Sequence, residues 1–228
     1  GSSEVCSSDR NPAWYQLGLA KADGSDAHAI TSGAFSHFHP AWSPDGTKIV
    51  FSSDGDGHQG IFIVNADGTG EVQITSGASD LSPSWSPDGT KIVYDAKPAG
   101  SDFFVLFVIN ADGTGQMQLT QADTDAYEAV FSPDGTRLAF TVHGDANDIW
   151  VINADGTNMV ALTEASGDND HSQWSPDGTK ILFTSTRDDG LHSQVYVMNA
   201  DGTGQMALTS DLTGHAYPSG SPNGGRRA

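Results

Sequence analysis

Histidine and carboxylate residues recur at two fixed distances before a repeated turn motif. The motif S-P-D-G-T begins at Ser43, Ser86, Ser132 and Ser175, and a degenerate form, S-P-N-G-G, begins at Ser221. Four positions before these serines stand His39, Ser82, Glu128, His171 and Tyr217. Six positions before them stand His37, Asp80, Ala126, Asn169 and His215. Neutral imidazoles beside carboxylates can hold a divalent ion such as Zn²⁺ or Mn²⁺, and they can also hydrogen-bond a polar ligand.

Three interpretations of this pattern stay open. The first is a ligand or partner site formed by His37, His39, Asp80, Glu128, Asn169, His171, His215 and Tyr217. The second is a divalent-metal site built from the same side chains. The third is a solvated polar rim that binds nothing. Beyond that metal the sequence indicates no cofactor.

Motifs for covalent catalysis are missing from the sequence. There is no G-x-S-x-G nucleophile turn and no G-x-x-x-x-G-K-[ST] phosphate loop. Cys6 is the sole cysteine, which excludes an internal disulfide and a C-x-x-C zinc site. The sequence therefore assigns no catalytic residue.

The elements that must position the candidate residues are repeated strands. A second motif, N-A-D-G-T, begins at Asn65, Asn110, Asn153 and Asn199, with a degenerate copy at Lys21. An Ile-Thr or Leu-Thr pair follows each copy, and the unit length of ~45 residues is typical of propeller blades. Each unit contains four short runs rich in branched and aromatic residues, which predict strands. We therefore predict an all-β fold, a five-bladed β-propeller with four antiparallel strands per blade.

The two chain ends are expected to complete one blade. Residues 4–9 align with the second strand of a unit, and residues 216–218 with a first strand. The N-terminal strands would then pair with the C-terminal strand, so that residues 1–228 form a single domain without an exposed sheet edge. An open array, or one that closes by oligomerisation, is the alternative.

The predicted topology separates two faces. Strands in a blade alternate in direction, so the S-P-D-G and N-A-D-G turns must lie on one face and the variable loops on the other. Strand side chains also alternate, which predicts that the residues four and six positions before the serines point to one side. Variable loops on a rigid scaffold commonly bind ligands, so we place the functional surface there.

Composition excludes several partners. The formal net charge is −19 and 17% of residues are charged, which argues against nucleic acid as a partner because that requires a basic face. No apolar run approaches the ~18 residues of a membrane span. The chain begins with no signal peptide, so any targeting segment is expected outside it.

The repeat W-S-P-D-G-T-K-I-V-F-x-S, followed by I-x-V-x-N-A-D-G-T-x-x-x-x-L-T, resembles that of the TolB-like β-propeller family. The resemblance covers nearly the whole chain. Members usually have six or seven blades, so five would be a departure. It implies a periplasmic or extracellular location and a protein partner bound through the propeller. The same repeat also occurs in oligogalacturonate lyases and in propeller domains of peptidases.

Together these features favour a non-enzymatic binding or scaffold module, natural, excised or engineered. A protein or peptide partner would dock at the variable-loop face around the central channel, and the acidic charge favours basic segments. We expect a monomer that binds no nucleic acid and does not insert into membranes. The alternative is a metal-dependent, lyase-like enzyme that uses the histidines and carboxylates at the channel mouth.

Overall fold

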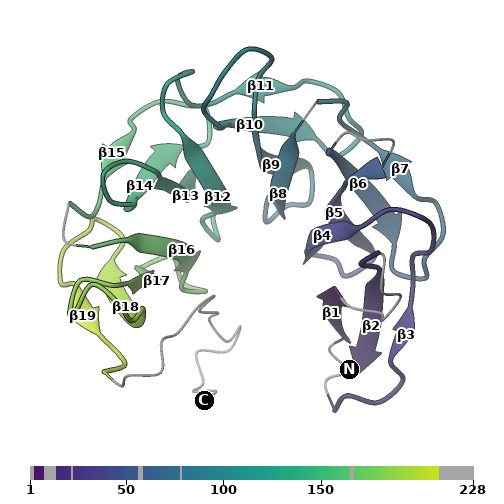
Figure 1. Ribbon diagram of the computed structural model, residues 1–228, viewed down its shortest axis with the longest axis horizontal. Helices are drawn as coiled ribbons and strands as arrows, with labels where there is room; N and C mark the ends of the chain where they lie inside the picture. The colour runs from purple at the N-terminus through teal and green to yellow at the C-terminus, as the bar shows by residue number, and fades with distance from the viewer. Residues whose placement is uncertain are drawn as a thin grey trace. The chain divides into compact units, whose positions relative to one another are not determined.

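The computed structural model describes residues 14–21, 23–55, 59–77, 79–164 and 167–210, together with the strand formed by residues 3–7. Over these residues the chain consists of short antiparallel strands and turns, with no α-helix (Figure 1). No helix in this part of the chain is long and apolar enough to cross a membrane.

Four sheets share one plan of four strands in sequence order. The first strands are β4 (His37–Trp42), β8 (Asp80–Trp85), β12 (Ala126–Phe131) and β16 (Asn169–Trp174). The second strands are β5 (Lys48–Ser53), β9 (Lys91–Ala96), β13 (Arg137–Val142) and β17 (Lys180–Ser185). The third strands are β6 (Gly60–Asn65), β10 (Val105–Asn110), β14 (Asp148–Asn153) and β18 (Gln194–Asn199). The fourth strands are β7 (Val72–Gln73), β11 (Met117–Gln118), β15 (Val160–Ala161) and β19 (Met206–Ala207).

A further sheet at the N-terminus has three described strands. They are β1 (Ser3–Ser7), β2 (Leu17–Lys21) and β3 (His28–Ala29), in that order. The register pairs Ser3 with Lys21 and Ser7 with Leu17. The predicted second-strand character of the N-terminal segment is therefore confirmed, although the strand begins and ends earlier than residues 4–9. The predicted C-terminal partner, residues 216–218, lies outside the described residues.

The repeated turns are held by their own side chains. In the turn before β13, Asp134 Oδ1 accepts hydrogen bonds from the Ser132 hydroxyl (2.6 Å) and from the Thr136 amide (3.0 Å). Gly135 adopts φ 72°, which only glycine adopts at little cost. The turn aspartates therefore act as hydrogen-bond acceptors within their own turns.

The Ile-Thr and Leu-Thr pairs fix the edge of each sheet. Each threonine hydroxyl accepts a hydrogen bond from an amide of the third strand, as Thr75 does from Ile61 and Thr163 from Ile149, both at 2.9 Å. The fourth strands end directly before these pairs. The side-chain hydroxyl thus continues the pairing after the two-residue strand.

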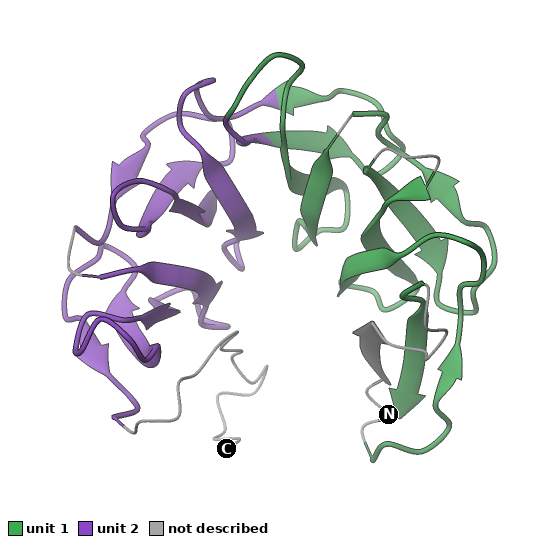
Figure 2. Ribbon diagram, in the orientation of Figure 1, with its two compact units in different colours: residues 1–102, 107–117 green, residues 103–106, 118–228 purple. Residues whose placement is uncertain are grey.

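The chain is divided into two compact units. Unit 1 comprises residues 1–102 and 107–117, and unit 2 comprises residues 103–106 and 118–228 (Figure 2).

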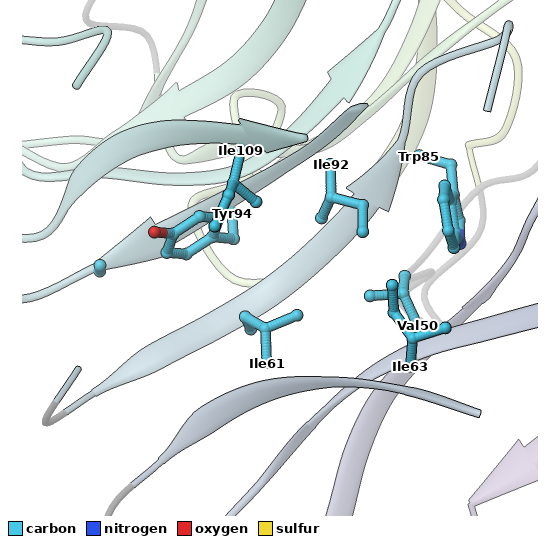
Figure 3. Packing of buried hydrophobic residues seen from close by; sticks show 8 residues of the cluster. Val50, Ile61, Ile63, Trp85, Ile92, Tyr94 and Ile109 are labelled. Atoms are coloured by element: carbon cyan, nitrogen blue, oxygen red, sulfur yellow. The ribbon is translucent and has the colours of Figure 1, made fainter. Parts of the chain in front are cut away.

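In unit 1, apolar side chains fill the space between adjacent sheets. Val50, Ile61 and Ile63 from β5 and β6 pack with Trp85, Ile92, Tyr94 and Ile109 from the next sheet (Figure 3). On its other side the β4–β7 sheet packs Phe51 against Leu17 of the N-terminal sheet. Alternate residues of β5 therefore face different neighbours, as expected for a sheet buried on both faces.

Unit 2 repeats this packing. Ile149 and Val151 from β14 cluster with Trp174, Phe183 and Met198 of the β16–β19 sheet. The Trp174 indole donates to the backbone oxygen of Val130 at 3.3 Å, as Trp85 does to Ala41 at 3.2 Å in unit 1. The aromatic residue at the end of a first strand therefore joins its sheet to the preceding one.

Candidate functional site

A β-bulge interrupts each first strand at the predicted site. The registers shift between Phe38 and Ala41 in β4 and between Asp170 and Gln173 in β16, and β8 and β12 shift at the same place. The residues four positions before the serines have left-handed backbones, with φ values of 50°, 47°, 54° and 55° at His39, Ser82, Glu128 and His171. Such conformations cost on the order of 1 kcal/mol or more for residues other than glycine. Their recurrence shows that the bulge belongs to the repeat.

The bulge separates the two predicted sets of side chains. His37, Asp80 and Asn169, six positions before the serines, are at most 4% exposed, whereas His39 is exposed and Glu128 is half-buried. The expectation that both sets point to one side is therefore wrong, because a bulge residue breaks the alternation of the strand. His215 and Tyr217 lie outside the described residues.

Two of the buried residues brace loops. Asn169 Nδ2 donates to the backbone oxygens of Gly167 (2.8 Å) and Asn147 (3.2 Å), and Asp80 Oδ2 accepts from the Gly77 amide (3.0 Å). Burial raises the pKa of Asp80, and the hydrogen bonds from Thr75 and Gly77 partly oppose this. These side chains hold the connections between sheets.

The structure brings Glu128 and His171 together. Glu128 Oε2 lies 3.7 Å from His171 Nε2, and both side chains are partly exposed. Burial raises the pKa of Glu128, with a further rise from Asp170 and a lowering by His171. The Thr184 hydroxyl donates to the backbone oxygen of Asp170 at 3.2 Å and also lies 3.2 Å from His171 Nδ1. His171 therefore has its other ring nitrogen, Nε2, on the side of the Glu128 carboxylate.

Residues missed by the sequence pattern surround this pair. Asn147 Nδ2 donates to Asp170 Oδ1 at 2.9 Å, and the pKa of Asp170 is raised, mainly by burial. His143 Nδ1 lies 3.2 Å from Asp125 Oδ2, and the Tyr127 hydroxyl donates to Asp125 Oδ1 at 2.7 Å. Asp125, His143 and Asn147 lie in loops that carry no repeat signal, so only the fold brings them beside Tyr127 and Asp170.

These side chains do not form a metal centre. In the described part of the chain, no group of three or more His, Cys, Asp or Glu residues is placed to hold a metal ion. Glu128 and His171 supply two candidate ligands, and structural and catalytic zinc sites use at least three from the protein. The described residues therefore do not supply the three protein ligands of a zinc site.

A cavity of ≈ 370 Å³ lies at the variable-loop end of the β4–β7 sheet. Its lining comes from the loop before β4, the ends of β4 and β5, and the β6–β7 region: Ser32, Phe35, His37, Ser53, Gly55, Phe62, Glu71, Gln73, Ser76 and Gly77. His37 is 3% exposed, and its Nδ1 has no hydrogen-bond partner among the described residues. Burial lowers the pKa of His37, with Asp54 partly opposing the effect, so its ring is neutral at pH 7.

A second cavity, of ≈ 510 Å³, lies among the repeated turns of unit 1. Pro44, Asp45, Pro87 and Gly89 line it. In these turns the glycine of one repeat lies close to the proline of the preceding repeat: a Cβ built on Gly89 would be 3.7 Å from Pro44. The same arrangement recurs in unit 2, where a Cβ on Gly178 would be 3.6 Å from Pro133. We therefore attribute this second cavity to sheet spacing common to the repeats.

Solved structures similar to this chain include TolB from Acinetobacter baumannii, with 26% identity over 97% of this chain and a TM-score of 0.81. An oligogalacturonate lyase in complex with manganese is 20% identical over 87% of the chain, with a TM-score of 0.68. An oligogalacturonate lyase from Vibrio parahaemolyticus is 18% identical over 87%, with a TM-score of 0.64. The chain spans 55%, 60% and 59% of their respective lengths.

The family described as the TolB beta propeller domain matches residues 1–130 and 125–227. These two segments take in nearly the whole chain, and the antiparallel four-stranded sheets agree with them. The chain belongs to the TolB β-propeller domain family.

Proposed function

We propose that this chain is a binding module that docks a protein or peptide segment at the variable-loop ends of its sheets. The observation that carries the proposal is the cavity of ≈ 370 Å³ at the loop end of the β4–β7 sheet, where Phe35, Phe62 and Glu71 line a space that a peptide side chain can enter. The net charge of −19 favours a basic partner.

We also propose that the chain closes as a single five-bladed domain. Trp42 stands where Trp85 and Trp174 stand in their sheets, yet its buried Nε1 has no hydrogen-bond partner among the described residues. Trp85 donates to Ala41 and Trp174 to Val130, and each acceptor stands two positions before the S-P-D-G serine of the preceding repeat. In a closed ring the repeat that precedes Trp42 is the C-terminal one, whose serine is Ser221, so the corresponding acceptor is Ser219. A C-terminal strand beside β1 would supply that carbonyl.

A disulfide can test this closure. The partners Ala41 and Val50 in the β4–β5 pair correspond to Ser219 and Val5. In a Cys6→Ser background, the pair Val5→Cys and Ser219→Cys should oxidise to a monomeric disulfide. The pair Val5→Cys and Tyr217→Cys, which is out of register, should oxidise more slowly. Equal rates for the two pairs, or disulfides only between chains, would contradict closure.

Selection of peptides from a random displayed library tests the binding function. Peptides retained by the wild-type chain should lose affinity for Phe35→Ala, because Phe35 lines the cavity at the loop end. They should keep their affinity for Val72→Ala, because Val72 is more exposed and lines the cavity among the turns. If no peptide is retained, or if only Val72→Ala weakens binding, the proposal fails.

The location and the enzymatic alternative rest on relatives. We propose a periplasmic or extracellular location, which the family suggests, and a monomeric state, which closure of the ring within one chain would allow. The oligogalacturonate lyases are 18–20% identical to this chain, which indicates a shared fold alone, so lyase activity stays the alternative. Metal analysis of the purified chain tests the alternative, which would require a stoichiometric divalent ion bound by residues that include Glu128 and His171.

A further inference from the structure

The β16–β19 sheet holds a half-buried arginine, Arg187, in a position that the repeat defines. The guanidinium group of Arg187 makes three hydrogen bonds. Nη2 donates to Asn169 Oδ1 at 2.7 Å, Nη1 donates to Gln205 Oε1 at 2.6 Å, and Nε donates to Ser185 Oγ at 2.9 Å. Its guanidinium carbon lies 4.7 Å from the centre of the Tyr196 ring and 5.4 Å from that of Phe183. Three acceptors and two rings therefore surround one guanidinium group.

The β4–β7 sheet has the same surroundings without the arginine. Counted from the repeat motifs, Gly55 stands at the position of Arg187, Ser53 at that of Ser185 and His37 at that of Asn169. Glu71 corresponds to Gln205, and Phe51 and Phe62 correspond to Phe183 and Tyr196. The two ring pairs also match, with centroids 5.7 Å apart for Phe51 and Phe62 and 5.6 Å apart for Phe183 and Tyr196.

The missing arginine side chain coincides with the cavity. His37, Ser53, Phe62 and Glu71 all line it, and so does Gly55. Building a Cβ on Gly55 would place it 3.9 Å from both Phe35 and Phe62, an ordinary contact distance. A side chain starting at residue 55 would therefore enter the same space that Arg187 fills in its own sheet.

We infer that this cavity binds the guanidinium group of an arginine in the docked peptide, with Ser53 and Glu71 as acceptors and the Phe62 ring as the stacking surface. The inference rests on the proposed peptide-binding function and names the side chain that is recognised. Glu71 adds a carboxylate where the internal site has a neutral amide, and a carboxylate can accept a paired hydrogen bond from arginine.

The acceptors offered to a ligand differ from those of the internal site. Asn169 Oδ1 accepts from Arg187 there, whereas His37 at the corresponding place has a fully buried Nδ1, so the carboxylate of Glu71 at the cavity wall is the main acceptor. By contrast, the β8–β11 sheet uses its own side chains, since Gln116 Nε2 donates to the Tyr94 hydroxyl at 2.7 Å.

Replacing Gly55 tests the inference directly. The Gly55→Arg variant should fill its own cavity, so that N-acetyl-arginine amide and arginine-containing peptides from the selection bind at least tenfold more weakly than to wild type. The Gly55→Ala variant changes the same backbone position without filling the cavity and should bind as wild type does. Equal affinity of Gly55→Arg and wild type would overturn the inference.

A second variant covers a failure of Gly55→Arg to fold. Glu71 is exposed, so Glu71→Lys should fold and should weaken binding of the same probe at least tenfold by repulsion. Glu164→Lys, at an exposed residue outside the cavity, makes the same change of charge and should leave affinity unchanged. If both lysine variants lower affinity equally, the effect is non-specific attraction and the inference is wrong.

Changes in the peptide separate this inference from the proposed function. Replacing the arginine of a selected peptide by lysine should lower affinity at least tenfold, because lysine cannot reproduce the planar, forked contact. If selected peptides bind in a Phe35-dependent manner but tolerate arginine-to-alanine replacement, the arginine inference is overturned while the binding function stands. If no peptide binds at the loop ends, the proposed function itself fails.

Discussion

Glu128 Oε2 lies 3.7 Å from His171 Nε2, and both residues occupy the left-handed bulge position of a first strand. The bulge turns the side chain at this position away from the buried row and leaves it partly exposed. Consecutive first strands in unit 2 can therefore present facing polar groups on the bulge. The side chain at this position can therefore differ from one sheet to the next without changing the packed residues beneath the bulge.

The Glu128–His171 pair predicts an unusual pH dependence of stability. The pKa of Glu128 is raised, mainly by burial, so the native state retains a proton that the unfolded chain has lost. Stability should therefore decrease as pH rises through the native pKa, since the folded state binds more protons there. We expect Glu128→Gln to melt about 2 °C higher than wild type at pH 7. Thermal melts at pH 7 and pH 4 check this, and the contradicting result is an advantage that grows at pH 4.

The turn aspartates predict the opposite behaviour in acid. Hydrogen bonds from Ser132 and Thr136 lower the pKa of Asp134 to about 2. Its stabilising contribution is complete above the unfolded pKa and is lost as pH falls through the native value. We expect Asp134→Asn to melt lower than wild type at pH 7 and to show a smaller loss between pH 4 and pH 2. Melting curves over that interval that run parallel for the two proteins would contradict the prediction.

The indole hydrogen bonds between sheets predict matched losses of stability. Trp85→Phe removes the donor to the Ala41 oxygen and should cost about 1 kcal/mol for the hydrogen bond, in addition to lost packing. If Ser219 accepts from Trp42 as proposed, Trp42→Phe should cost about the same. Urea titration of both variants measures this. A much smaller cost for Trp42→Phe would argue against the closing strand.

The internal guanidinium site predicts a strong dependence on Arg187. Arg187→Ala removes the donors to Asn169 and Gln205 and the stacking on Tyr196. We expect a loss of about 2–3 kcal/mol, from hydrogen bonds of ~1 kcal/mol and a partly buried cation–π contact. Arg187→Lys should recover only part of it. Chemical denaturation checks the order, and equal stability of wild type and Arg187→Ala would contradict it.

The repeated motifs predicted most of the described strands because turns and strands each carry a local signal. S-P-D-G and N-A-D-G specify the turns through proline, glycine and aspartate, and the aromatic at residue 85 or 174 marks the end of a first strand. The bulges carried no such signal. His39 and Glu128 are ordinary residue types for a strand, so only the shifted register reveals their left-handed backbones.

The candidate site was only partly predictable from the sequence. The motif count placed His37 at a special position, but its burial and its place in the cavity follow from the bulge two residues later. Arg187 and Gly55 occupy equivalent positions that alignment of the repeats can identify. That this difference leaves a cavity depends on the rings of Phe62 and Tyr196, and therefore on tertiary packing.

The central claim is that partners dock at the variable-loop ends. Hydrogen–deuterium exchange of the chain with and without a selected peptide tests this claim most directly. The account predicts slower exchange in residues 32–37, 53–55 and 71–77 on binding, with the S-P-D-G turns at Ser43 and Ser86 unchanged. Protection confined to those turns, with the three loop segments exchanging as in the free protein, would contradict it.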